Sequence, residues 1–289
     1  MKHLKLRKLL LSAVMLPVIL LSSGCSTSMS NVDIEPPTSG ILHYLQQSSM
    51  ANVSDNAYQV QVAAIDGTDR LLDGSNALSL RVLDPSGQPV SKFTEDMTKL
   101  MHLIIVNRDL SIFQHLHPEY RGDGSFETTA DFPAGGEYLL IEEFVPDDQP
   151  ITVTKQWVSV TGKESAEKRL QPGQGMVQTL GGITASVSIM PDLGSLRAGQ
   201  MVMIEYHLAD AKTGEPLQLE PYLGTAGHSV ILNEEADQYV HVHAVTEMSN
   251  GSNVMFHTAF PAAGKYRIWG QFQYNGEVLT LPFDVEVQP

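Results

Sequence analysis

One pattern of histidines occurs twice in the chain, and this internal duplication most constrains the fold. His102 is followed by histidines 13 and 15 residues later, and His228 is followed by histidines at the same two offsets. The six residues are His102, His115, His117, His228, His241 and His243. The residues between the histidines differ, although all three histidine positions match. An internal repeat on this scale indicates two similar domains in tandem.

Strand-like segments and turn motifs also recur in both halves. The motif Phe132-Pro-Ala-Gly-Gly-Glu-Tyr138 matches Phe260-Pro-Ala-Ala-Gly-Lys-Tyr266, and the turn at 84–90 matches the turn at 210–217. Each half has about seven short strand-like runs bounded by turn residues, and neither half has a convincing long helix. We therefore predict an all-β protein with one antiparallel β-sandwich in each half. The tyrosine of the repeated motif is expected to pack at a sandwich corner.

The N-terminal residues have the layout of an export signal. Four basic residues precede the apolar run 9–21, which is shorter than the about 20 residues of a membrane-spanning helix. Cys25, the only cysteine, follows directly after Ser22-Ser-Gly24. This layout resembles a bacterial lipoprotein signal, which implies cleavage before Cys25 and attachment of a lipid to its thiol. The alternative is an ordinary secretory signal with an incidental cysteine.

Changes in composition divide the chain into five segments. These are a lipoprotein signal peptide at 1–24, a flexible tether at 25–55, a first β-sandwich at 56–162, a linker at 163–175 and a second β-sandwich at 176–289. The tether is rich in Ser, Asn, Thr and Pro, and the linker is polar with Pro and Gly.

The charge of the chain excludes some partners. Removal of residues 1–24 takes away four of the 18 basic residues and leaves 14 against 33 acidic ones. This excess of negative charge argues against binding to nucleic acid and against electrostatic docking on anionic lipid. No further segment is long and apolar enough to cross a membrane. We expect a cell-envelope protein outside the cytoplasm, anchored to the membrane by a lipid on Cys25.

Each histidine set is expected to lie on a β-hairpin. If His102 lies directly opposite His115, a four-residue loop remains at 107–110, and the same register in the second copy leaves a loop at 233–236. The three histidines of each copy then share one face of the sheet, because residues two apart on a strand point the same way. Three imidazoles at such positions could converge on one metal ion. The sequence therefore predicts one three-histidine site per domain.

The ligand types favour some metals over others. Imidazole suits copper, zinc, iron and nickel, and thiolate sites are not expected because Cys25 is assigned to the lipid. Met101 precedes His102, and a thioether there would favour Cu(I), while His257 could add a ligand in the second copy. We predict copper, with zinc as the alternative. Histidines on a strand can also be a surface pair or bond to the backbone without any metal.

Several segments resemble the YtkA-like group of exported β-sandwich proteins, in the wider company of CopC-like copper-handling domains. They are Lys99-Leu-Met-His-Leu-Ile-Ile-Val106, Asp109-Leu110, Phe113-Gln-His-Leu-His-Pro118 and the Phe-Pro…Gly-x-Tyr motif. The likeness covers residues 56–162 and 176–287, and it implies an immunoglobulin-like fold and handling of copper outside the cytoplasm. A tether precedes the first strand, so the N-terminal-amine copper site of CopC-like proteins is not matched.

Three classes of function were compared. The first is a metal-binding protein for storage, delivery or protection, which would work with a metal-transport partner of unknown identity. The second is a structural or adhesive cell-envelope module without metal. The third is an enzyme, because a His-x-His strand is similar to part of a copper–zinc superoxide dismutase site, but its bridging histidine and zinc-side aspartate cannot be placed in this sequence. We therefore predict a binding protein and no enzyme.

Overall fold

The strand-like segments of the first half fold into two sheets. A computed structural model describes residues 57–68, 70–147, 149–245 and 248–289. The signal peptide predicted at 1–24, the tether predicted at 25–55 and Cys25 lie outside these residues. Within the described residues, no helix has both the length and the apolar character that crossing a membrane requires.

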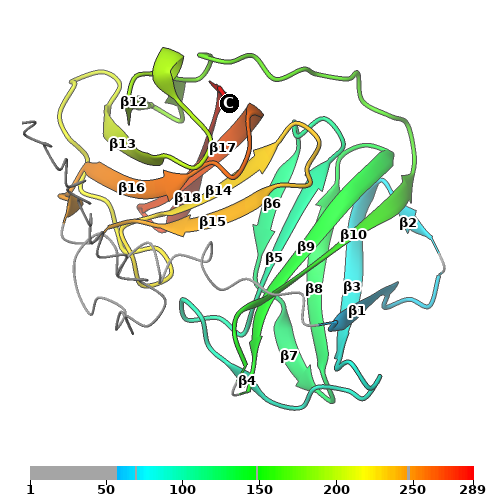
Figure 1. The fold of residues 1–289 in the computed structure, drawn as a ribbon. Coiled ribbons are helices and arrows are strands. Elements are labelled where there is room, and N and C mark those ends of the chain that lie inside the picture. Colours follow the sequence, from blue (N-terminus) through cyan, green and yellow to red (C-terminus); the bar gives the residue numbers. More distant parts are fainter. Residues whose placement is uncertain (1–56, 69, 148, 246–247) are drawn as a thin grey trace, which may run out of the picture. The chain divides into compact units, whose positions relative to one another are not determined.

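The first repeat contains the strands β1 to β10 (Figure 1). They are β1 (Gln59–Ala64), β2 (Leu71–Leu72), β3 (Gly74–Leu83), β4 (Phe93–Thr94), β5 (Met101–Asn107), β6 (Phe113–Leu116), β7 (Glu119–Gly122), β8 (Ser125–Phe132), β9 (Gly136–Pro146) and β10 (Thr152–Thr161). One sheet has the order β1-β3-β8-β7 and the other the order β2-β10-β9-β5-β6, while β4 pairs with β9. All pairs are antiparallel except β2 with β10. This is the two-sheet strand order of an immunoglobulin-like sandwich.

The second repeat contains β11 to β18 and a short 3₁₀ helix. The elements are β11 (Val177–Leu180), β12 (Ile183–Met190), η1 (Leu193–Ser195), β13 (Met201–Asp210), β14 (His228–Asn233), β15 (Tyr239–His243), β16 (Asn253–Ala259), β17 (Gly264–Tyr274) and β18 (Glu277–Val287). The sheets have the orders β11-β12-β13-β16 and β15-β14-β17-β18. The predicted all-β fold of two tandem immunoglobulin-like sandwiches is confirmed.

The repeated Phe-Pro…Gly-x-Tyr motif forms the predicted corner in both repeats. The hydroxyl of Tyr138 donates a hydrogen bond of 2.8 Å to the carbonyl of Ala134, and Tyr266 donates one of 2.8 Å to the carbonyl of Ala262. Both tyrosine rings are fully buried. This backbone bond is the tyrosine corner of immunoglobulin-like sandwiches, and it fixes where β9 and β17 enter the core.

The register of the two hairpins differs from the predicted one. Ile104 pairs with His115 in the first hairpin, and His228 pairs with His243 in the second. The prediction that His102 lies opposite His115 is therefore wrong by two residues, and both loops are longer than four residues.

The side chain of an asparagine explains the longer loops. Asn107 accepts a 2.8 Å hydrogen bond from the backbone N–H of Ile112, five residues on, and Asn233 accepts one of 2.8 Å from the N–H of Gln238. These bonds close a wider loop than a simple type I turn would. Because the shift is an even number of residues, every side chain keeps its predicted face of the sheet.

The strands that carry the first histidine of each set are buried on both faces. All seven residues of β5 and all six of β14 are buried. Leu103 and Ile105 of β5 point into the core of their own sandwich, while Ile104 and Val106 belong to a separate apolar cluster. The alternation along a strand therefore gives β5 two different apolar surroundings.

This separate cluster combines side chains of both repeats, and we call it the inter-repeat interface. Its buried members are Ile104, Val106, Leu110, Leu139, Ile141, Val153, Leu170, Val230, Leu232, Ala236 and Trp269. Phe113 of β6 stacks on Trp269 of β17, with ring centroids 4.6 Å apart and an interplanar angle of 20°. Both repeats belong to one compact unit.

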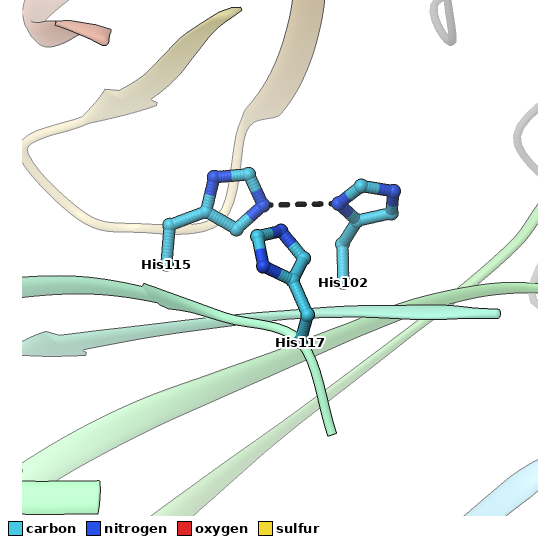
Figure 2. Close-up of side chains that lie close together, drawn as sticks. All are labelled: His102, His115 and His117. Carbon is cyan, nitrogen blue, oxygen red and sulfur yellow. Dashed lines mark hydrogen bonds between the residues drawn. The ribbon is translucent and has the colours of Figure 1, made fainter. Parts of the chain in front are cut away.

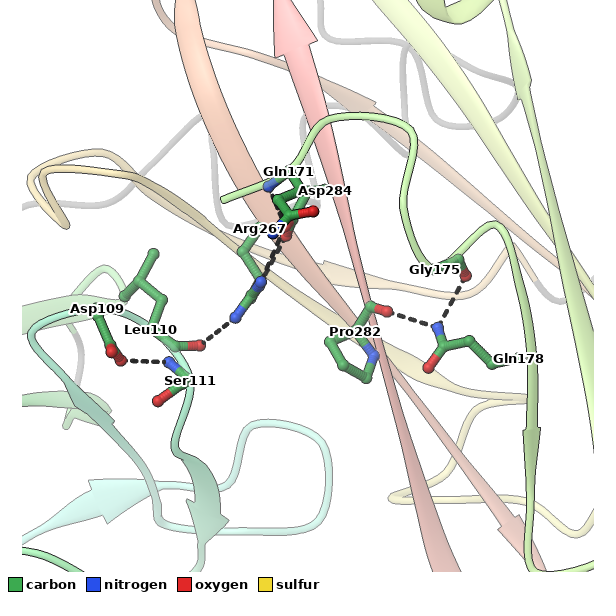
Figure 3. Close-up of polar contacts among 9 residues, drawn as sticks. All are labelled: Asp109, Leu110, Ser111, Gln171, Gly175, Gln178, Arg267, Pro282 and Asp284. Atoms are coloured by element: carbon green, nitrogen blue, oxygen red, sulfur yellow. Dashed lines mark hydrogen bonds and ion pairs between the residues drawn. The ribbon is translucent and has the colours of Figure 1, made fainter. Parts of the chain in front are cut away.

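Polar contacts reinforce the inter-repeat interface (Figure 3). Arg267 of β17 donates a 2.9 Å hydrogen bond to the carbonyl of Leu110 in the first hairpin loop, and it pairs with Asp284 of β18 at 2.7 Å. Asp284 also accepts a 2.8 Å bond from the N–H of Gln171 in the segment between the repeats. One arginine–aspartate pair thus ties together the first hairpin, the connecting segment and the second sheet.

Candidate metal centre

The first triad consists of His102, His115 and His117. His102 lies near the start of β5, His115 lies on β6, and His117 directly follows β6. One ring nitrogen from each lies within 4.8 Å of the others. Figure 2 shows the three rings gathered on one side of the sheet, with Nδ1 of His102 3.0 Å from Nε2 of His115.

The partners of the outer nitrogens determine which nitrogens carry protons. Nε2 of His102 is 3.1 Å from the backbone carbonyl of Asp96, and Nδ1 of His115 is 2.7 Å from the side-chain oxygen Oε1 of Gln271. A carbonyl oxygen only accepts, so both contacts are hydrogen bonds in the tautomers that carry their protons on these two nitrogens. In a neutral imidazole the other nitrogen then carries a lone pair, so two lone pairs face each other at 3.0 Å.

Two facing lone pairs repel, and a metal ion that accepts both of them removes the repulsion. Nitrogens bound to one ion at about 2.0–2.1 Å lie roughly 3.3 Å apart at the tetrahedral angle. The separations of 3.0 Å in the first triad and 3.3 Å in the second are close to that spacing. The first triad therefore has the donor type and the donor spacing of a metal site.

The second triad consists of His228, His241 and His243, with His228 on β14 and the other two on β15. Their ring nitrogens also lie within 4.8 Å of one another. Nδ1 of His241 is 2.9 Å from the carboxylate oxygen Oε1 of Glu143, which lies on β9 of the first repeat. The carboxylate accepts this proton, so Nε2 of His241 keeps a lone pair directed at Nδ1 of His228.

Burial keeps most of these imidazoles neutral, which is the form that binds metals. Burial, with a smaller effect of His102, lowers the pKa of His117 to about 3. The pKa values of His115, His228 and His241 are held well below the ordinary value, mainly by burial and then by neighbouring histidines. Their lone pairs are therefore available at neutral pH, with no proton to displace.

Buried ring nitrogens of both triads have no hydrogen-bond partner among the described residues. They are Nε2 of His117, Nε2 of His228 and Nε2 of His243. An unsatisfied buried polar atom costs about 1–3 kcal/mol, so native proteins contain few of them. A ligand that coordinates imidazole would account for the nitrogens of His117 and His243, whereas the nitrogen of His228 that faces His241 is Nδ1.

The two triads adjoin at the inter-repeat interface. The ring centroid of His241 is 5.5 Å from those of both His102 and His115. His228 lies 6.4 Å from His102 and 6.3 Å from His115 by the same measure. The six predicted histidines therefore form one group of rings between the repeats, where the sequence predicted two separate groups.

Two carboxylates lie beside the rings. Glu143 is buried, and its other oxygen accepts a 3.2 Å bond from the hydroxyl of Tyr239. Asp96 has a buried oxygen, Oδ2, without a hydrogen-bond partner among the described residues. Burial raises the pKa of both carboxyl groups, while the nearby His102 and His243 oppose this shift. Their negative charges would compensate cations held by the triads.

The two extra candidate ligands are not part of these groups. Met101 is fully buried in the core of the first sandwich with Leu103 and Ile105, because it alternates with His102 along β5. His257 lies on β16, in the sheet that does not contain β14 and β15, and it joins neither triad. Cys25 lies outside the described residues.

Sequence reasoning missed three residues that contact the triads, namely Asp96, Glu143 and Gln271. Glu143 had a signal in the sequence, because Glu142-Glu143 interrupts the otherwise apolar strand Leu139–Val145. A charged residue in such a strand is rarely buried without a specific partner. Asp96 and Gln271 have no comparable signal in the sequence. Asp96 contacts His102 through its backbone carbonyl in a loop, and Gln271 contacts His115 across the inter-repeat interface.

Comparisons with solved structures give loose matches. A mutant of alpha-2-macroglobulin from Salmonella is 9% identical, with a TM-score of 0.27, and the match covers 83% of this chain and 15% of that one. A segment of two fibronectin type III domains from chicken tenascin is 12% identical, with a TM-score of 0.22, and covers 79% and 98%. The bacterial integrin-binding protein invasin is 12% identical, with a TM-score of 0.21, and covers 78% and 39%.

The sequence comparisons identify the repeated unit. No curated protein matches the sequence significantly. The family model described as "Domain of unknown function (DUF8832)" matches residues 52–162 and, a second time, residues 180–289. The matches cover more than half of the chain and coincide with its two repeats. The chain therefore belongs to the DUF8832 family and contains its domain twice.

Proposed function

We propose that this chain is a metal-binding protein of the cell envelope that holds copper ions with its two histidine triads. It lies outside the cytoplasm, attached to the membrane by a lipid on Cys25, and it stores, delivers or sequesters the metal without catalysing a reaction. The location rests on the N-terminal sequence, and the metal function rests on the site.

One observation carries the metal function. Nδ1 of His102 and Nε2 of His115 lie 3.0 Å apart, while the other nitrogen of each ring donates to an oxygen. A hydrogen bond between the two facing nitrogens is not available to neutral rings in these tautomers. The arrangement is unfavourable for empty rings and favourable for coordinated ones.

The chemistry around the triads supports copper. The donors are imidazoles, and a thiolate is absent from the described residues near them. Because the cost of burying an ion rises steeply with its charge, a dry site favours Cu(I) over a divalent ion. Two monovalent ions would be balanced by the carboxylates of Glu143 and Asp96. The resemblance of residues 99–118 to YtkA-like exported proteins points to the same metal, and zinc is the alternative.

Metal titration of the intact protein tests this proposal. Protein stripped with a chelator is titrated with Cu(I) held by a competing chelator, and separately with Zn²⁺. We expect tight binding of Cu(I), and a double variant His102→Ala/His228→Ala should lose most of it. His207→Ala is the matched control, because His207 on β13 bonds to Asn253 and belongs to neither triad. Absence of binding for both metals would refute the proposal.

A structural or adhesive module without metal is the second candidate. The hydrogen bonds of His115 to Gln271 and of His241 to Glu143 favour it, because they join the two repeats directly. In that case the double variant would unfold more easily than the wild type, and neither metal would bind to or stabilise the wild-type protein.

A further inference from the structure

We propose that the two triads form one two-metal centre shared by the repeats, in which each repeat tunes the ligands of the other. This inference rests on the proposed metal-binding function and goes beyond it. Independent sites, one in each domain, would bind metal and lose it on mutation separately, whereas in a shared centre the binding of one ion affects the binding of the other.

Rings of the two triads lie close together. The centroids of His102 and His115, within the first triad, are 5.3 Å apart, and those of His228 and His241, within the second, are 5.5 Å apart. Between the triads, His102 and His115 both lie 5.5 Å from His241. The shortest separation between rings of different triads thus equals the longest separation within one triad. Two ions held by these rings share the buried volume, so each ion affects the binding of the other.

The two repeats also exchange hydrogen bonds reciprocally. Glu143 pairs with His102 across neighbouring strands of the first repeat, and Gln271 pairs with His228 in the second, so the two residues are structurally equivalent. Each bonds to the middle histidine of the opposite repeat. Glu143 accepts from His241 at 2.9 Å, and Gln271 accepts from His115 at 2.7 Å.

Such outer partners control a metal site. A hydrogen bond to the remote nitrogen orients a ligating imidazole and raises its donor strength, and its loss typically costs about 10- to 100-fold in affinity. Here the partner of each triad comes from the other repeat. Neither triad is therefore complete without the opposite sandwich.

The two exchanged hydrogen bonds differ in their acceptor, and this difference ranks the two triads by metal affinity. Glu143 offers a carboxylate to His241, whereas Gln271 offers a neutral amide to His115 and donates its own N–H to Thr280 at 3.3 Å. A carboxylate strengthens an imidazole ligand more than an amide does. We therefore expect the second triad to bind the first ion, and the first triad to bind the second ion more weakly.

Electron paramagnetic resonance with Cu²⁺ as the probe tests the shared centre in the full chain. With one equivalent we expect the spectrum of an isolated ion. With two equivalents we expect broadening by the second spin, together with a half-field transition. Two bound ions with the undisturbed spectra of isolated centres would overturn the inference and leave the metal function standing. A capacity of one ion per chain, for Cu²⁺ or for Cu(I), would overturn it as well, and absence of binding of Cu²⁺, Cu(I) and Zn²⁺ alike would reject the metal function itself.

The cross-repeat tuning is tested with a triple variant, His102→Ala/His115→Ala/His117→Ala, which keeps only the second triad. Adding Glu143→Gln to it should lower Cu(I) affinity about 10- to 100-fold, although Glu143 belongs to the other repeat. Adding Glu142→Gln is the matched control, because that neighbour accepts its hydrogen bonds from Thr154 and Gln156, on the opposite face of β9. Equal Cu(I) affinity of the variants with Glu143→Gln and with Glu142→Gln would overturn the proposed cross-repeat tuning.

The reciprocal experiment keeps only the first triad, with alanine at 228, 241 and 243. Gln271→Glu in this background should raise Cu(I) affinity, because a carboxylate replaces the amide that bonds to His115. An unchanged affinity would overturn the ranking. Circular dichroism of each variant confirms that the fold is retained, so a loss of binding reports on the ligands.

Discussion

Glu142 should make the protein less stable as the pH rises, and its replacement by glutamine should remove this effect. Glu142 lies on β9 and is fully buried. Its two oxygens accept hydrogen bonds from the hydroxyl of Thr154 at 2.7 Å and from the amide of Gln156 at 2.8 Å. Both partners are neutral, so neither hydrogen bond brings a positive charge to the carboxylate.

The magnitude follows from the shift in the pKa. Burial raises the pKa of Glu142 from 4.5 to about 8, against the opposing effect of the two hydrogen bonds. Between these values the folded protein keeps a proton that the unfolded chain has lost, so stability is greatest below pH 4.5 and falls as the pH rises toward 8. At about 1.36 kcal/mol for each pH unit, the total loss is about 5 kcal/mol.

Glutamine imitates the protonated acid, since its amide can donate to Thr154 and its oxygen can accept from Gln156. We expect Glu142→Gln to resemble the wild type near pH 5. By pH 8 the variant should be more stable than the wild type by about 3–4 kcal/mol.

Urea unfolding of chelator-treated protein, followed by circular dichroism between pH 5 and pH 9, measures the difference. With a slope of about 2–3 kcal/mol per molar urea, the midpoints should separate by between about 1 and 2 M at pH 8. Asp96 and Glu143 titrate in both proteins, so their effects cancel in the comparison. A separation that does not grow with pH would show that Glu142 is not a buried, proton-holding group.

Two further predictions concern the interface and the corners. Trp269→Ala removes the ring stacked on Phe113 and should destabilise the inter-repeat interface by about 3–5 kcal/mol. Thermal unfolding should then separate into two transitions. A single transition at the wild-type temperature would contradict this. Tyr138→Phe and Tyr266→Phe each remove one hydroxyl-to-carbonyl hydrogen bond. Each should lower the free energy of unfolding, measured by chemical denaturation, by about 1–2 kcal/mol, and by similar amounts because the corners are equivalent. A marked inequality would mean that the two corners do not stabilise their sandwiches equally.

Much of the fold could be predicted from the sequence because its signals are local. Alternating apolar residues and turn motifs predict the strands, and the repeated motif that ends in Tyr138 predicts the corner. The hairpin register was missed, because it depends on a side chain, that of Asn107, which bonds to the backbone of Ile112 and widens the loop. The shared face of the histidines was nevertheless correct, since an even shift preserves it.

The arrangement of the site depends on contacts between residues far apart in the sequence. His115 and Gln271 are separated by 156 positions, and His241 and Glu143 by 98. Periodicity describes which face of a strand is apolar, but it does not say which surface covers that face. The burial of the apolar side chains beside the histidines against the other repeat could therefore not be predicted from the sequence.

The crossed bonds of Glu143 and Gln271 suggest how a centre of this kind can originate. Two identical single-domain chains, related by a twofold axis, would place the same residue at both positions and build a symmetric version. Joining the two domains in one polypeptide removes that constraint, because each half can then change independently. An acid at one position and an amide at the other is a difference that a homodimer could not encode.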